Sequence, residues 1–224
     1  MRRLALAGVV LGAWCAVAGA NGRPPNTSTI NFQRGNSQHI AAGMTFGLLL
    51  SNDGGQTWTW ICEAALPYSG QFDPVYAYSP SGALFATTFN GLKVMRDGCT
   101  FEGTAVGSAY MSGVIAGSGS AIIATASSPT DSTIYRSTDD GQTFAPLAMP
   151  GLPDDYWASF AIAPSNPQRV YLAGYRLVKE CDDNSVNAGS ACSLNASCTP
   201  AGSAAATCTL VKLFLLGRSD DGGA

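Results

Sequence analysis

Ser51-Asn52-Asp53-Gly54-Gly55-Gln56-Thr57-Trp58 is matched along its whole length by Ser137-Thr138-Asp139-Asp140-Gly141-Gln142-Thr143-Phe144. A weaker copy reads Arg96-Asp97-Gly98-Cys99-Thr100-Phe101, and a fourth copy begins at Ser219-Asp220-Asp221-Gly222-Gly223. The motif threonines Thr57, Thr100 and Thr143 are each 43 residues apart. A fixed period of this length indicates repeated structural units stacked on one another.

The repeated segment has the chemistry of a hairpin turn. The side chains of Asp53 and Asp139 can accept hydrogen bonds from backbone N–H groups further along the turn. The glycines at the fifth position allow a backbone conformation that side chains with a Cβ disfavour. We therefore expect Asp53 and Asp139 to build the fold and not to act as catalytic carboxylates.

Strand-forming residues precede each turn in the same order, with Gly, Pro, Ser and Asn between the runs. Four strands in about 43 residues is the size of one propeller blade. The predicted first strands are Thr29–Gln33, Pro74–Ser79, Ser112–Ala116 and Ser159–Ala163. The second are His39–Gly43, Ala83–Thr87, Ala121–Thr125 and Arg169–Gly174, and the third are Gly47–Ser51, Leu92–Arg96, Ser132–Ser137 and Lys212–Arg218. A fourth strand is expected after each motif aromatic.

The motif resembles the Asp-box, or BNR, repeat of sialidases, sortilin-type receptors and xyloglucanases. Aligned by the 43-residue spacing, the second copy has Val94 and Arg96 in place of the motif Ser and Asp. The resemblance implies an all-β propeller of four-stranded antiparallel blades, with about three complete blades and an incomplete fourth. It also implies that the chain is the N-terminal part of a longer protein. The structural Asp-box residues are Ser51, Asp53, Gly55, Thr57, Trp58, Ser137, Asp139, Gly141, Thr143, Phe144, Ser219, Asp221 and Gly223.

The N-terminus has the pattern of a secretory signal peptide covering residues 1–20. Arg2 and Arg3 precede an apolar run, and Ala18-Gly19-Ala20 supplies the small residues of a cleavage site. No later apolar run would span a membrane, so we expect a secreted, periplasmic or cell-surface protein with its propeller at residues 21–224. The whole chain has a net charge of −3 without a basic cluster, which makes nucleic acid a poor partner.

A Cys-rich insertion is expected at about residues 175–210, between the second and third strands of the fourth unit. Cys181, Cys192, Cys198 and Cys208 lie in it, and two disulfides would hold it. The spacings lack a Cys-x-x-Cys pair and a nearby histidine, so no metal site is expected. In such propellers the connection between the second and third strands of a blade lies on the face opposite the Asp-boxes, where ligands bind. The resemblance therefore places this insertion on that face. It is interpreted either as a lid or partner-binding loop or as an insertion without function.

Cys62 and Cys99 remain as a third pair of cysteines. The repeat aligns Cys99 with Gln56, six residues before Cys62, which is about 20 Å along a strand and too far for a disulfide. Pairing would require the fourth strand of the first unit to bend back. We favour pairing, because free thiols are uncommon in exported proteins.

Candidate site residues lie where first strands begin. Asp73 precedes one such strand, and Asp154 and Asp155 precede the matching strand two units later, beside Tyr156 and Trp157. We take Asp73 and Asp155 as candidate catalytic carboxylates, and Asp73, Tyr156 and Trp157 as candidate ligand-binding residues. The alternative is that both carboxylates cap turns. His39 is expected to be a turn or core residue.

Two hypotheses about function follow. The first is a non-catalytic propeller that binds an extracellular protein or glycan and needs no cofactor or metal. The second is a glycoside hydrolase, xyloglucanase-like or less plausibly sialidase-like, whose catalytic residues lie partly beyond residue 224. A sialidase would need a Phe/Tyr-Arg-Ile-Pro motif, and the segment around Arg34 lacks its Ile-Pro.

Overall fold

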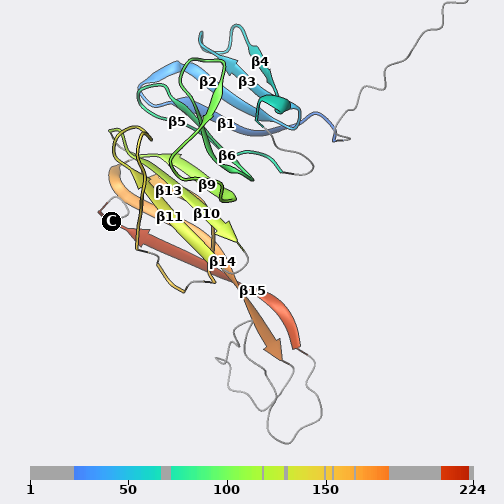
Figure 1. Ribbon diagram of the computed structural model, residues 1–224, viewed down its shortest axis with the longest axis vertical. Coiled ribbons are helices and arrows are strands. Elements are labelled where there is room, and N and C mark those ends of the chain that lie inside the picture. The colour runs from blue at the N-terminus through green and yellow to red at the C-terminus, as the bar shows by residue number, and fades with distance from the viewer. Residues whose placement is uncertain are drawn as a thin grey trace, which may run out of the picture.

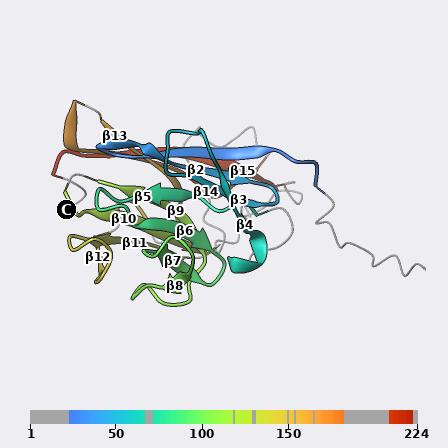
Figure 2. The ribbon, with the colours of Figure 1, turned by 90° about the horizontal axis from the view of Figure 1, so that it is seen from above.

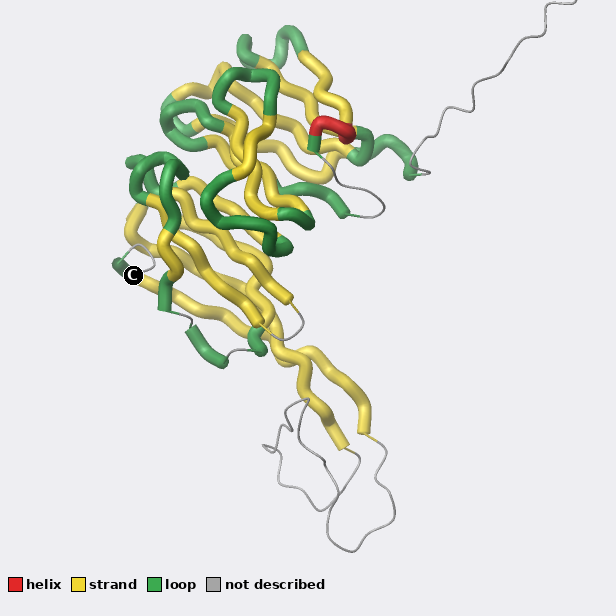
Figure 3. The backbone as a smooth tube through the Cα atoms, in the orientation of Figure 1, coloured by secondary structure: helices red, strands yellow, loops and turns green. Residues whose placement is uncertain are grey.

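The computed structural model describes residues 23–66, 72–117, 119–128, 131–148, 150–152, 154–163, 165–181 and 208–221. The predicted signal peptide lies outside the described residues. The described chain is all-β, as predicted, apart from one 3-10 turn, η1 (Glu63–Ala65) (Figure 3).

Four antiparallel sheets follow one another along the chain, and we call them blades 1 to 4 (Figure 1). Blade 1 contains β1 (Thr27–Gln33), β2 (Asn36–Met44), β3 (Gly47–Ser51) and β4 (Thr59–Cys62). Blade 2 contains β5 (Tyr76–Tyr78), β6 (Leu84–Thr88), β7 (Gly91–Met95) and β8 (Phe101–Gly103). Blade 3 contains β9 (Met111–Ala116), β10 (Ile122–Ser128), β11 (Asp131–Ser137) and β12 (Ala145–Pro146). Blade 4 contains β13 (Tyr156–Ala163), β14 (Asn166–Cys181) and β15 (Cys208–Ser219).

Each blade is a simple meander in which every strand pairs with the next one along the chain. The first strands of successive blades contact each other in the order β1, β5, β9 and β13. They therefore form the inner edge of an arc, and the fourth strands form its outer rim (Figure 2). All twelve predicted strands overlap observed ones, and the prediction of a propeller with an incomplete fourth blade is confirmed by the three-stranded sheet of blade 4.

Apolar residues on the middle strands form the core between blades. β6 is buried along its whole length because blades 1 and 3 cover its two faces. Alternation of side chains divides its residues: Leu84 and Ala86 pack towards blade 1, whereas Phe85 packs towards blade 3. The core is thus a series of sheet-on-sheet interfaces and not one central cluster.

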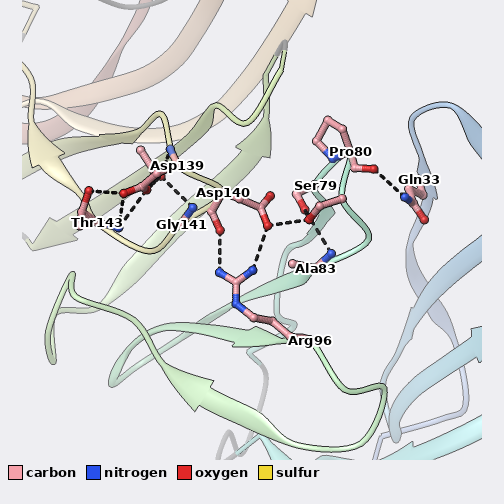
Figure 4. Close-up of polar contacts among 11 residues, drawn as sticks. Gln33, Ser79, Pro80, Ala83, Arg96, Asp139, Asp140, Gly141 and Thr143 are labelled. Carbon is pink, nitrogen blue, oxygen red and sulfur yellow. Dashed lines mark hydrogen bonds and ion pairs between the residues drawn. The ribbon is translucent and has the colours of Figure 1, made fainter.

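Polar contacts also join neighbouring blades on one face of the arc (Figure 4). Arg96 of blade 2 donates to the carboxylate and to the backbone carbonyl of Asp140 in blade 3. Ser81 donates to the same carboxylate at 2.6 Å. Between blades 1 and 2, Gln33 Nε2 donates to the carbonyl of Pro80 at 2.8 Å. These contacts fix the rotation of one sheet against the next.

The β14–β15 hairpin extends well beyond the body of blade 4 (Figure 1). Its backbone register continues to Cys181, which lies opposite Cys208. Part of the predicted Cys-rich insertion is therefore an elongation of this hairpin. Residues 182–207, with Cys192 and Cys198, lie outside the described residues, so the predicted disulfides of the insertion stay predictions.

Candidate functional site

The loops at the two ends of the strands form two opposite faces of the arc. The turn after a third strand contacts the turn after a first strand of the same blade: Asp140 N donates to Ser120 O at 2.9 Å. On the other side, the turn after β6 contacts the connection entering β9, where Gly91 N donates to Ala109 O at 2.8 Å. We call these the Asp-box face and the ligand-side face, respectively. Gly91 has a φ of 92°, and a Cβ there would lie 2.0 Å from Gly107 O, so this close approach requires glycine.

The Asp-box turns of blades 1 and 3 have the same hydrogen bonds. Asp53 accepts from Thr57 N at 2.9 Å, from Thr57 Oγ1 at 2.5 Å and from Ser51 Oγ at 2.8 Å. Ser51 Oγ in turn accepts from Gly55 N at 2.8 Å. Asp139 makes the equivalent bonds with Ser137 and Thr143. Both carboxylates thus accept hydrogen bonds from residues of their own turns, as expected for a structural role.

These bonds favour the ionised carboxylates. The Thr57 hydroxyl, followed by the Thr57 amide, lowers the pKa of Asp53 to about 2. The Thr143 hydroxyl and amide lower the pKa of Asp139 to about 2 in the same way. A general acid needs a raised pKa, so neither group is suited to protonate a leaving group.

The second copy of the motif corrects the sequence alignment. In the register of the sheets, Met95 lies where Ser51 and Ser137 lie in their blades. Asp97, and not Arg96, therefore takes the place of the motif Asp, and its carboxylate accepts from Cys99 N and Thr100 N at 2.9 and 2.8 Å. Because this turn is one residue shorter, alignment by the threonines shifted Val94 and Arg96 onto the motif positions. In blade 4, Ser219 and Asp221 hydrogen-bond to each other, and Gly223 lies outside the described residues.

Two clusters of aromatic rings lie on the ligand-side face, one on blades 2 and 3 and one on blade 4. Phe72 enters β5, and its ring centroid lies 4.5 Å from that of Phe89 in the β6–β7 turn. Phe89 stacks on Tyr110, which enters β9, at 5.5 Å. Tyr156, at the start of β13, stacks on Tyr175 of β14 at 4.9 Å. Lys212 lies beside the second cluster, with its Nζ 4.1 Å from the Tyr175 ring centroid.

The two clusters meet between blades 3 and 4. Burial raises the pKa of Tyr156 well above its ordinary value, and a hydrogen bond with Tyr110 adds to that effect. Tyr156 therefore stays neutral at physiological pH. Phe89 is half exposed, and Phe72, Tyr110, Tyr156 and Tyr175 are partly exposed, so the rings present apolar surface to solvent. We call these five rings with Lys212 the aromatic band.

Both candidate carboxylates are bound by arginines. Asp73 forms a two-pronged ion pair with Arg23, with both N–O distances 2.8 Å. Asp155 is buried and accepts from Arg176 Nε at 2.5 Å and from Arg176 Nη2 at 2.9 Å. Asp155 also accepts from Leu152 N at 2.9 Å, which closes the turn before β13. Asp154 is more exposed and lies 3.9 Å from Arg176.

The structure separates the two neighbouring aromatics of the predicted site. Tyr156 belongs to the aromatic band, whereas Trp157 is 3% exposed and packs between blades 3 and 4. Alternation along β13 sends the two side chains to opposite faces of the sheet. A ligand on the ligand-side face would therefore meet Tyr156. His39, predicted to be a turn or core residue, is a partly buried residue of β2 whose Nδ1 lies 2.5 Å from Gln33 Oε1 and whose ring lies near that of Tyr78.

The favoured pairing of Cys62 with Cys99 is not formed. Both are free, exposed thiols. Cys62 ends β4 opposite Gly47, on the ligand-side end of blade 1, whereas Cys99 lies in the Asp-box turn of blade 2 on the other face. The fourth strand of blade 1 does not bend back. The separation of Cys62 and Cys99 expected from the repeat is therefore correct, and the favoured pairing is wrong.

Among the described residues, no group of His, Cys, Asp and Glu side chains is arranged to hold a metal ion. Within the same residues, no helix has the length and apolar character needed to cross a bilayer. An apolar cavity of about 220 Å³ lies between blades 3 and 4, lined by Ile123, Ile134, Leu147, Phe160 and Leu172 among others.

Comparison with solved structures supports the fold. The xyloglucanase of family GH74 from Xanthomonas campestris is similar over 88% of this chain, with a TM-score of 0.56 and 17% sequence identity. An ancestral GH74 enzyme is similar over 67% of this chain, with a TM-score of 0.45 and 16% identity. The chain spans 29% of the length of the first and 22% of the second. No protein-family model and no curated protein matches the sequence.

Together the blades, the Asp-box turns and this similarity define a β-propeller protein. At 17% identity the similarity establishes the fold alone, and the function has to be argued from the site.

Proposed function

We propose that the protein is an exported β-propeller that binds a glycan along its aromatic band. The observation that carries the proposal is a pair of ring clusters, Phe72–Phe89–Tyr110 and Tyr156–Tyr175, that a hydrogen bond between Tyr110 and Tyr156 joins across blades 2, 3 and 4. Aromatic faces pack against the apolar C–H faces of sugar rings, while a phenol or an ammonium can bond to hydroxyl groups. Tyr110, Tyr156 and Lys212 supply those polar groups.

The position of the band also supports the proposal. It lies where connections between blades converge on the first strands, which form the rigid inner edge of the arc. Loops held by a rigid scaffold are the usual location of binding residues. Export rests on the signal-peptide pattern of residues 1–20.

The charges beside the band favour binding over catalysis. A glycosidase needs one carboxyl group that holds a proton and a second that acts as base or nucleophile. Arg23 and Arg176 each hold one of the two candidate carboxylates, Asp73 and Asp155, through two hydrogen bonds. Both candidate carboxylates are thus bound by side chains of this chain, which favours a structural role for them.

A glycoside hydrolase is the second candidate, because the similar structure is a xyloglucanase. Under this alternative the described blades would supply part of a substrate-binding surface. Asp73 would then be needed for turnover, together with a second carboxylate.

Affinity gel electrophoresis tests the proposed function. The purified chain would be run in gels containing xyloglucan, mixed-linkage glucan, xylan, alginate or polygalacturonate. We expect retardation by at least one of them, weakened about three- to tenfold by Phe89→Ala and by Tyr175→Ala, since an aromatic contact contributes about 0.5–1.5 kcal/mol. Trp58→Ala is the matched control, because it removes an exposed aromatic from the Asp-box face.

The same measurements, made on the protein expressed from its full-length gene with the same substitutions, separate the two candidates. Retardation without release of reducing ends supports a binding protein. Release of reducing ends by the wild-type chain, lost in Asp73→Asn but retained in Phe89→Ala at high substrate, supports the hydrolase. Equal retardation of all variants, or of none including wild type, would refute the aromatic band as a glycan site.

A further inference from the structure

The β14–β15 hairpin of blade 4 continues as a two-stranded ribbon beyond the rest of its sheet. β13 pairs with β14 only as far as Tyr156, which lies opposite Tyr175. Beyond Tyr175, β14 pairs with β15 alone among the described strands, through six further residue pairs that end with Cys181 opposite Cys208. This ribbon is the part of the hairpin that projects from the body in Figure 1.

Side chains fasten the base of the ribbon to the rest of blade 4. Arg176 donates to the buried Asp155 carboxylate, and Val178 is 8% exposed. Towards the tip, no described strand other than β14 and β15 takes part in the ribbon. A two-stranded hairpin is at best marginally stable in water, so a further constraint at the tip would stabilise this one.

Cys181 and Cys208 form the last residue pair of the ribbon. The register runs from Val170 opposite Ser219 to the two cysteines without a bulge. Directly opposite positions on antiparallel strands lie on one face of the sheet, with Cα atoms about 4.5–5.5 Å apart. A disulfide accepts Cα separations of about 4.4–6.8 Å, so the pairing of the strands meets its geometric requirement.

The two cysteines described elsewhere in the chain belong to other blades. Cys62 ends β4 in blade 1, and Cys99 lies in the Asp-box turn of blade 2. Both are free thiols. Neither belongs to the sheet that contains β14 and β15, so among the described residues the register offers Cys181 a partner in Cys208 alone.

We infer that Cys181 and Cys208 are joined by a disulfide that closes the ribbon at its tip. The four cysteines of the insertion allow three pairings, and the register selects the one that contains this bond. Its formation joins the two Sγ atoms, while two protons and two electrons pass to a disulfide of a thiol oxidoreductase or of oxidised glutathione, which becomes two thiols. In the cell this step rests on the proposed export, because the cytosol keeps thiols reduced.

The bond stabilises the strands that carry one end of the aromatic band. Tyr175 lies next to the ribbon and Lys212 lies within it. Opening of the hairpin from its tip would separate Lys212 Nζ from the Tyr175 ring, whose centroid lies 4.1 Å away. A cross-link between Cys181 and Cys208 also constrains the opened chain, and so reduces the entropy gained on opening.

Disulfide mapping tests whether the bond forms. The purified chain would be equilibrated in a buffer of reduced and oxidised glutathione, so that pairs can exchange, and free thiols would then be alkylated. Thermolysin is needed to cut between the four cysteines, because residues 180–212 form a single tryptic peptide. We expect cross-linked peptides that contain Cys181 and Cys208. Alkylation of both, or a bond from either to Cys192 or Cys198, would overturn the inference.

Limited digestion with trypsin tests what the bond does. Cleavage after Lys179, which lies in the ribbon, should be about tenfold or more faster in Cys181→Ser/Cys208→Ser than in the oxidised wild type, because the tip opens more often. Cleavage after Lys93 of β7 should be equal in the two proteins, which shows that the blades of the variant are folded.

Cys192→Ser/Cys198→Ser is the matched control, since it removes two cysteines and leaves the ribbon pair. It should be cut after Lys179 at the wild-type rate. Wild-type rates in both double variants would overturn the inference that the bond holds the ribbon closed. Neither readout involves a polysaccharide, so the outcome for the bond is independent of whether the chain binds a glycan.

Discussion

Asp140 in the Asp-box turn of blade 3 and Arg96 in blade 2 form the ion pair that joins these two blades, with Nη1 2.9 Å from Oδ2 (Figure 4). Asp140 adopts a φ of 60°, at the turn position where blade 1 has Gly54. A non-glycine residue rarely adopts this conformation, and here its carboxylate reaches across the interface. The turn position that holds Gly54 in blade 1 thus holds, in blade 3, a residue that contacts the neighbouring blade.

Replacing Arg96 therefore tests whether this ion pair holds the blades together. Arg96→Met leaves the half-buried Asp140 carboxylate without its cation, and we expect a loss of about 1–2 kcal/mol in the free energy of unfolding. Asp140→Gly should cost less, because it also relieves the positive φ. Urea denaturation checks both, with the exposed Arg34→Met as control. A loss in Arg96→Met no larger than in that control would contradict the account.

Gly141 and Gly98 offer a matched comparison of backbone strain and steric overlap. Their φ values are 74° and 77°, but a Cβ on Gly141 would lie 2.4 Å from Phe85, whereas one on Gly98 meets nothing within 4 Å. Gly98→Ala should cost about 1–2 kcal/mol for the left-handed conformation alone. Gly141→Ala should cost about 1–3 kcal/mol more, because Phe85 is fully packed between blades 2 and 3. Equal losses on urea denaturation would show that Phe85 moves aside freely.

The Asp-box carboxylates predict how stability depends on pH. The pKa values of Asp53 and Asp139 are about 2 in the folded chain, against an ordinary value of 3.8. A pKa lowered by folding contributes stability that is present above pH 3.8 and is lost as the pH falls towards 2. The melting temperature should therefore decrease over this window, and the Asp53→Asn/Asp139→Asn double variant should show a shallower decrease. Identical slopes for the two proteins would contradict the proposed hydrogen-bond network.

Asp155 and Asp73 should differ in how much they stabilise the fold. Asp155 is buried against Arg176, so Asp155→Asn leaves a partly buried guanidinium with only the more distant Asp154 carboxylate and should cost up to about 3–5 kcal/mol. The Asp73–Arg23 pair is partly exposed on both sides, and Asp73→Asn should cost about 0–1 kcal/mol. Thermal and urea unfolding of the two variants would check this. Equal losses of unfolding free energy in the two variants would contradict the expectation that the more deeply buried ion pair stabilises the fold more.

The repeat explains how much of the fold was predictable. Turn chemistry near Asp53 and Asp139, together with the spacing of apolar runs, was sufficient to place every predicted strand. The one misplaced turn, at Asp97, followed from a single missing residue that equal spacing of the threonines concealed. Only the pairing of residues between neighbouring strands, which the structure gives and the sequence does not, shows this one-residue shift.

The aromatic band was not predictable to the same degree. Tyr156 could be named because it adjoins the entry to a first strand, but Phe72, Phe89 and Tyr110 were missed. Their contacts depend on three connections that are distant in sequence and adjacent only after the first strands line up. Likewise, Arg23 and Arg176 carry no local signal for binding Asp73 and Asp155, from which they are separated by 50 and 21 residues.

Hydrogen–deuterium exchange of the wild-type chain with and without saturating xyloglucan oligosaccharide, or whichever polysaccharide fragment retards it, tests the central claim most directly. We expect slower exchange in the segments that contain Phe89, Tyr110 and Tyr156, with the Asp-box turns at Asp53 and Asp139 unchanged. Protection confined to the Asp-box turns, or spread evenly without these three segments, would show that the aromatic band is not the glycan site.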